Sequence, residues 1–176
     1  MKIVLFGDSL FGQFGKNRIL KLEAMIPGSD VYNCAAGGWD SNDCVKKAPY
    51  IARLKPDIMI LSLGTNDASS WKLVDIETFK INVPQIINAF TDSRIIYMLP
   101  PPSDESKQPH DRLRKNETLK QYYDVAKNIC GQKEFRLLIR GIFSNQCLIA
   151  MKSITLRTEL IWRRMPTILS FLKLPN

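Results

Sequence analysis

The chain has 176 residues, enough for one domain with an ordinary hydrophobic core. Its composition, 45 % hydrophobic and 24 % charged, is that of a soluble globular protein. No apolar run approaches the roughly 18 residues that cross a bilayer. The apolar run after Met1 and Lys2 is also too short for a signal peptide, so we expect a cytoplasmic protein without a membrane span.

The formal net charge of +8 raises the question of a nucleic-acid partner. Most of the excess comes from residues 134–176, which hold seven Lys and Arg against two Asp and Glu. No basic run is interleaved with aromatic residues, as a nucleic-acid groove requires, and we predict no such partner. A basic nucleic-acid-associated protein stays as an alternative, and its affinity would fall steeply with salt.

The cysteines are scattered and form no Cys-x-x-Cys pair. No histidine cluster accompanies them, so we predict free thiols rather than a metal site or a disulfide. They are Cys34, Cys44, Cys130 and Cys147.

Strand and helix patterns alternate along the first part of the chain, as in folds with a parallel sheet. The expected elements are a strand at 2–6, a helix at 16–25, a strand at 30–34, a helix that starts at Ser41 as its N-cap and stops before Pro56, and a buried strand at 57–63.

The alternation continues beyond that strand. Pro84 is expected to kink or divide the next helix. The expected elements are that helix at 75–90, a strand at 94–99, a polar loop through His110, an amphipathic helix at 113–129 stopped at Gly131, a strand at 135–139 and a final helix at 166–174. We expect a single domain over 1–176, without repeats or linkers.

Small and polar residues follow three of the apolar runs, at the point where each strand ends. Gly7–Leu10 reads Gly-Asp-Ser-Leu, Asn33–Ser41 contains two adjacent glycines, and Gly64–Asp67 reads Gly-Thr-Asn-Asp. The carboxyl ends of parallel strands meet at one edge of a sheet, where open α/β folds bind their ligands. The pattern therefore predicts that the Ser9 hydroxyl lies in a site at that edge.

In these three blocks, in this order and at ordinary spacing, the chain resembles the SGNH hydrolase, or GDSL esterase/lipase, family. The resemblance implies a flavodoxin-like three-layer α/β/α sandwich around a mostly parallel sheet. It implies hydrolysis of small-molecule esters through an acyl-enzyme, without metal or organic cofactor. Ser9 would be the nucleophile, and the Gly38 N–H and the Asn66 side chain would form the oxyanion hole. Gly37 would take the glycine role if the loop shifts.

Each block also has a purely structural interpretation. Gly37 and Gly38 could form a loop that needs positive φ. Asn66 and Asp67 could form a cap or an Asx turn, and Asp8 is expected to order the serine loop by accepting backbone N–H bonds. The neighbouring residues of the edge either wall an acyl pocket or simply pack: Trp39, Trp71 and Pro100–Pro102.

The family's last block, an Asp-x-x-His before the final helix, is missing. His110 is the chain's one histidine and lies instead in the loop after the fourth strand. It is a candidate base that could reach the edge from there. A protein that keeps the pocket without the base would be an acyl- or carbohydrate-binding module, which is the alternative function.

A displaced reading frame would explain the missing block. One permitted codon set for Arg157–Arg164, read from its third base, encodes Asp-Gly-Thr-His-Leu-Glu-Glu. We therefore hypothesise that roughly 136–165 is translated out of frame. With a triad member missing, we expect weak or no esterase activity from the chain as it stands.

Overall fold

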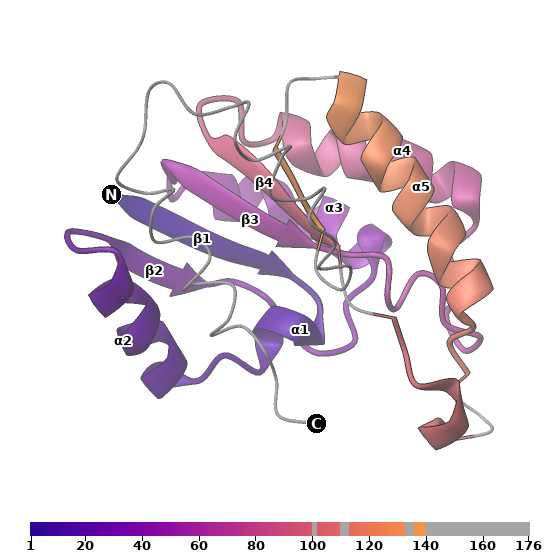
Figure 1. Ribbon diagram of the computed structural model, residues 1–176. Coiled ribbons are helices and arrows are strands. Elements are labelled where there is room, and N and C mark those ends of the chain that lie inside the picture. Colours follow the sequence, from indigo (N-terminus) through magenta and orange to yellow (C-terminus); the bar gives the residue numbers. More distant parts are fainter. Residues whose placement is uncertain (100–101, 110–112, 133–135, 140–176) are drawn as a thin grey trace.

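Five parallel strands form the sheet of the computed structural model, which describes residues 1–99, 102–109, 113–132 and 136–139 (Figure 1). The spatial order is β2-β1-β3-β4-β5, as in flavodoxin-like folds. The strands are β1 (Lys2–Gly7), β2 (Asp30–Asn33), β3 (Ile58–Ser62), β4 (Arg94–Leu99) and β5 (Arg136–Ile139).

Helices cover both faces of the sheet. Along β1, Val4 and Phe6 face a core shared with α3, α4 and α5, whereas Ile3 and Leu5 face a second core shared with α1 and α2. The predicted three-layer α/β/α class is confirmed. The helices are α1 (Ser9–Gly12), α2 (Lys16–Met25), α3 (Ser41–Ala52), α4 (Ile76–Asn88), the 3₁₀ turn η1 (Glu105–Lys107) and α5 (Asn116–Gln132).

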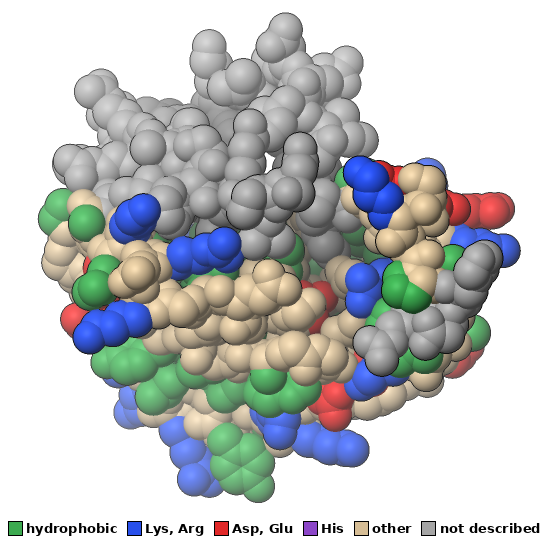
Figure 2. Space-filling view, turned by 90° about the horizontal axis from the view of Figure 1, so that it is seen from below, with side chains coloured by type: hydrophobic (Ala, Val, Ile, Leu, Met, Phe, Trp, Pro, Cys, Tyr) green, Lys and Arg blue, Asp and Glu red, His purple; other side chains and the backbone are tan. Residues whose placement is uncertain are grey.

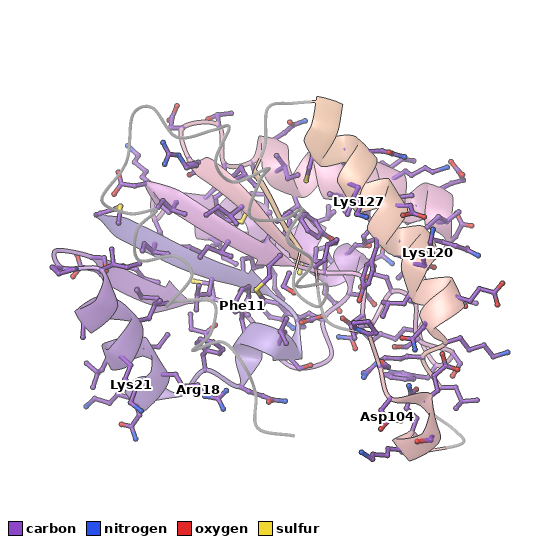
Figure 3. All side chains as sticks on the ribbon, viewed as in Figure 1. Phe11, Arg18, Lys21, Asp104, Lys120 and Lys127 are labelled. Atoms are coloured by element: carbon purple, nitrogen blue, oxygen red, sulfur yellow. The ribbon has the colours of Figure 1, made fainter. Side chains whose placement is uncertain are left out.

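The side chains of the second face illustrate this layering. Figure 3 shows Phe11 beneath the sheet and Arg18 and Lys21 along the outer side of α2. Phe11 is fully buried and packs against Phe14, with ring centroids 5.8 Å apart. The short α1 therefore presents an apolar side to the sheet while its first residue, Ser9, stays partly exposed.

Two helix ends differ from the sequence-based expectation. Ser41 is not the N-cap of α3, because Asp40 takes that position and exchanges hydrogen bonds with Asp43 in a capping box. α5 does not stop at Gly131. That glycine lacks the positive φ of a helix-ending glycine, and the helix runs on to Gln132.

Pro84 does not divide α4, which is continuous from Ile76 to Asn88. The proline removes the N–H that would bond to the Lys80 carbonyl, four residues earlier. Lys80 is on the exposed side of the helix, where water can take the place of that donor.

The described surface carries both hydrophobic and charged groups. Figure 2 shows Lys and Arg side chains spaced around the described part of one face rather than joined in a single patch. Within the described ranges, no helix has the length and apolar character needed to cross a bilayer. Three of the four cysteines lie within these ranges, and all three are free thiols, as predicted.

Candidate active site

Ser9 lies immediately after β1, as the first residue of α1. Asp8 caps this short helix: its Oδ1 accepts from the Leu10 N–H at 2.9 Å, as expected of an aspartate that orders the loop. The Asp8 N–H donates to the Ser62 carbonyl at 3.2 Å, which ties the turn to β3. Among the described residues the Ser9 hydroxyl has no hydrogen-bond partner. The backbone bonds of the turn therefore hold Ser9 in place, and its hydroxyl is not used in a bond to another described residue.

The glycine loop after β2 packs against the serine turn. The Ala36 N–H donates to the Gly7 carbonyl at 3.2 Å. A Cβ placed on Gly37 would lie 4.0 Å from the Ser9 Cβ, so backbone and serine side chain are neighbours there. Gly38 has φ +81°, the conformation that the structural interpretation of this loop required. The loop thus places Gly37 against the serine turn, with Gly38 as the next residue along the chain.

Asn66 joins the third block to the second. Its Nδ2 donates to the Trp39 carbonyl at 2.8 Å, and its side chain is almost fully buried. Asp67 has the structural role: Oδ1 accepts from the Ser41 N–H and Oδ2 from the Gly64 N–H. Both side chains thus bond to backbone: Asp67 accepts from the Ser41 and Gly64 N–H groups, and Asn66 donates to the residue that follows Gly38.

The Asp8 carboxylate connects the first and third blocks. Burial is the largest effect and raises its pKa to about 6, and nearby Asp67 acts in the same direction. The Leu10 N–H, the Thr65 hydroxyl and Arg114 act in the opposite direction. The Thr65 hydroxyl lies beside Asp8 but outside hydrogen-bonding geometry, because neither it nor Asp8 Oδ2 has a partner among the described residues.

Replacement of Asp8 by Asn is expected to remove a pH-dependent cost to stability. The pKa of Asp8 is about 6 in the folded chain, above the ordinary 3.8, so between these values the folded state binds more protons. The free energy of unfolding therefore falls as pH rises through this window, by up to about 3 kcal/mol. Above pH 6 the Asp8→Asn variant should be the more stable by a similar amount.

Urea unfolding of both proteins from pH 4 to pH 8 measures this difference. The exposed Asp92→Asn serves as the matched control and should follow the unmodified chain. A difference between Asp8→Asn and the unmodified chain that stays constant with pH would contradict the assignment.

The described residues contain no histidine. His110, the candidate base, lies outside them, as do Pro100 and Pro101 of the expected pocket wall. No group of three or more His, Cys, Asp or Glu side chains in the described ranges could hold a metal ion.

Of the expected wall residues, Trp39 and Trp71 have different surroundings. Trp71 is 41 % exposed, and the Arg114 guanidinium lies over its ring. Trp39 borders a hollow of about 490 Å³ whose lining does not include Ser9 or Asn66. The hollow is lined by Asn33, Cys34, Ala35, Trp39, Lys47, Tyr50 and Ile51.

Arg114 is the site residue that sequence reasoning missed. Its Nε donates to Ser69 Oγ at 3.0 Å, and Nη2 donates to Asn66 Oδ1 at 3.4 Å. Arg114 and Asn66 are 48 positions apart, so no local pattern marks this contact. In the sequence Arg114 is one of several basic residues before a helix.

Solved structures of esterases share this fold. A lipase/acylhydrolase from Enterococcus faecalis has a TM-score of 0.68 at 24 % identity over 77 % of this chain and 74 % of that one. The acetyl xylan esterase AlAXEase has a TM-score of 0.66 at 16 % identity, over 79 % and 77 %. The esterase EstA from Pseudoalteromonas sp., inhibited by monoethylphosphonate, has a TM-score of 0.62 at 16 % identity, over 97 % and 93 %.

No protein among the curated sequences matches the chain. The sequence pattern of one protein family does match the chain. The match spans all three blocks and all five described strands, except the first residues of β1. Because this match covers residues 5–140, the chain belongs to the GDSL-like lipase/acylhydrolase family of esterases and acylhydrolases, as the three blocks predicted.

Proposed function

We propose that the chain hydrolyses small-molecule esters with Ser9 as nucleophile and with the Gly38 N–H and the Asn66 amide as oxyanion donors. The observation that supports this most is the meeting of three loops. Gly37 lies against Ser9, and Asn66 bonds to Trp39, the residue after Gly38. These contacts link three short segments that are far apart in the sequence, and they support a shared site at the serine turn.

In the first step the Ser9 Oγ attacks the ester carbonyl carbon, and the carbonyl π electrons move to its oxygen. An Asn amide remains neutral at any working pH and can donate to the resulting oxyanion. Collapse of the tetrahedral species expels the alcohol, which takes the serine's proton by way of a base. Water then attacks the acyl-enzyme by the same route and releases the acid. The Trp39 carbonyl accepts one Asn66 N–H, and the amide's second N–H, which bonds to no other described residue, would donate to the oxyanion.

The described residues include no histidine that could act as the base. His110 is one candidate, and an out-of-frame Asp-x-x-His block is the other. The absence of that block from the sequence favours a second candidate function, an acyl- or carbohydrate-binding module. Single-domain organisation, a cytoplasmic location and the lack of a nucleic-acid partner stay predictions.

Labelling with a fluorophosphonate probe tests the nucleophile directly. In a frame-corrected protein, which supplies the base, Ser9 Oγ should attack the phosphorus, lose its proton to the base and expel fluoride, which adds the probe's mass less HF to the peptide containing Ser9. The adduct should be absent from Ser9→Ala and present in Ser70→Ala, because Ser70 is an exposed serine of the third-block loop that makes no side-chain bond in the described part of the chain.

Labelling that persists in Ser9→Ala would remove Ser9 from the role. If the unmodified chain takes no label, while short acyl esters raise its melting temperature without product, the binding module is the better assignment.

A further inference from the structure

A cation lies beside the proposed oxyanion hole without an ion-paired acid in the described part of the chain. The Arg114 guanidinium is half-buried, bonds to Ser69 and Asn66, and lies 4.8 Å from the centroid of the Trp71 ring. Among the described residues no carboxylate lies within ion-pair distance of it. The described part of the chain thus holds this positive charge partly out of water, with the Asp8 carboxylate beyond ion-pair distance as its opposing charge.

Such an arrangement costs free energy unless an anion completes it. A guanidinium remains charged at working pH, and a partly desolvated charge without a counterion is unfavourable. Partial burial lowers the pKa of Arg114, and the nearby Asp8 charge opposes that shift without forming an ion pair. The carboxyl of Asp8 has a pKa of about 6 and is mostly ionised at neutral pH, but it lies beyond ion-pair distance and accepts no hydrogen bond from the guanidinium.

The guanidinium also has donors to spare. It carries five N–H groups, and its bonds to other described residues, Ser69 and Asn66, use two. Stacking on Trp71 fixes its plane, so the remaining N–H groups point in fixed directions, as a planar carboxylate requires. Since Nη2 lies 3.4 Å from Asn66 Oδ1, this anion position adjoins the amide assigned to the oxyanion.

We propose that Arg114 binds a carboxylate carried by the ester substrate, so that the site prefers acidic esters to neutral ones. The proposal rests on the proposed function, because it places this carboxylate next to the reacting carbonyl. Arg114 is in this view a specificity-determining residue, with Trp71 as its support.

Two matched pairs of esters test the preference. Mono(4-nitrophenyl) adipate and 4-nitrophenyl hexanoate differ in an acid on the acyl side, and 4-(butyryloxy)benzoate and phenyl butyrate differ in an acid on the alcohol side. In Arg114→Gln, the ratio of kcat/KM for the acidic ester to that for the neutral one should fall about tenfold or more in one pair. The exposed neighbour Lys115→Gln removes the same charge from the chain and should keep both ratios.

Equal losses on the acidic and neutral members of both pairs would overturn the proposal, because they would show that Arg114 only orients Asn66. An Arg114→Gln variant that hydrolyses all four esters as fast as the unmodified chain would overturn it as well. Titration calorimetry of ester binding to the Ser9→Ala variant distinguishes a failure of the Arg114 proposal from a failure of the hydrolase assignment. There the acidic ester of one pair should bind more tightly than its neutral partner, and the added Arg114→Gln should abolish the difference whether or not the chain turns over esters.

Discussion

Restoring the displaced frame after Ile139 is expected to raise kcat/KM for 4-nitrophenyl butyrate by about 10²–10⁴-fold over the present chain. The physical reason is the proton of Ser9, which needs an acceptor within hydrogen-bond reach before the oxygen can attack. The described residues include the proposed nucleophile and oxyanion donors but no histidine to accept this proton. The corrected segment would add Asp-x-x-His, in which the carboxylate orients the imidazole and the imidazole takes the proton.

The structure moves the start of the hypothetical displacement. Arg136–Ile139 forms β5 and pairs in parallel with β4 over four residues, so this part belongs to the sheet and not to a displaced segment. The family match ends at residue 140, next to that strand. We therefore place the proposed displacement after Ile139, rather than at residue 136.

The nucleotide sequence across codons 130–170 provides the first measurement. Stop codons in the third-base frame, or a frame without Asp-x-x-His, would refute the hypothesis before any protein is made. In the corrected protein, Ser9→Ala should return hydrolysis to background, whereas Ser70→Ala should leave it unchanged. A corrected protein no faster than the present chain would show that the missing block is not what limits the reaction.

The sheet and its active edge were predictable because they depend on short-range patterns. The apolar runs predicted both ends of each of the five described strands to within one residue. Parallel pairing of these strands then puts Ser9, the glycine loop and Asn66 at the same edge of the sheet. The four-residue α1 could not be predicted in this way, because it is too short for an apolar periodicity. Its cap, Asp8, is visible in the sequence only as part of the Gly-Asp-Ser block.

Side-chain partnerships across the site lay beyond sequence reasoning. Asn66 and Asp67 are adjacent and chemically alike, yet only the fold shows which one holds backbone N–H groups and which one turns to the glycine loop. The Arg114–Asn66 contact joins a loop before α5 to the end of β3, and no spacing rule links them. The adjacent Asn66 and Asp67 thus mark the site in the sequence, whereas the role of each side chain depends on tertiary contacts.

Replacing Gly7 by Ala is expected to lower the free energy of unfolding by at least about 4 kcal/mol, which would leave little folded protein. A Cβ at this position would lie 1.9 Å from the Ser62 carbonyl oxygen, and that atom is backbone of the central strand β3. The φ of +130° adds strain of its own, since L side chains rarely adopt it. Relief would require β1 and β3 to separate at the point where Asp8 bonds to Ser62.

Variants at two other glycines distinguish the steric clash of the added Cβ from the strain of a positive φ. Gly28 has φ +77° with open space around its would-be Cβ, so Gly28→Ala should cost only the left-handed conformation, about 1–2 kcal/mol. Gly15 has neither a positive φ nor a neighbour within 4 Å, and Gly15→Ala should be close to neutral apart from its N-cap position. Urea unfolding of the three variants should rank them in that order. If Gly7→Ala unfolds no more easily than Gly28→Ala, β1 and β3 can separate without loss, and the tight serine turn is not what holds Ser9 in place.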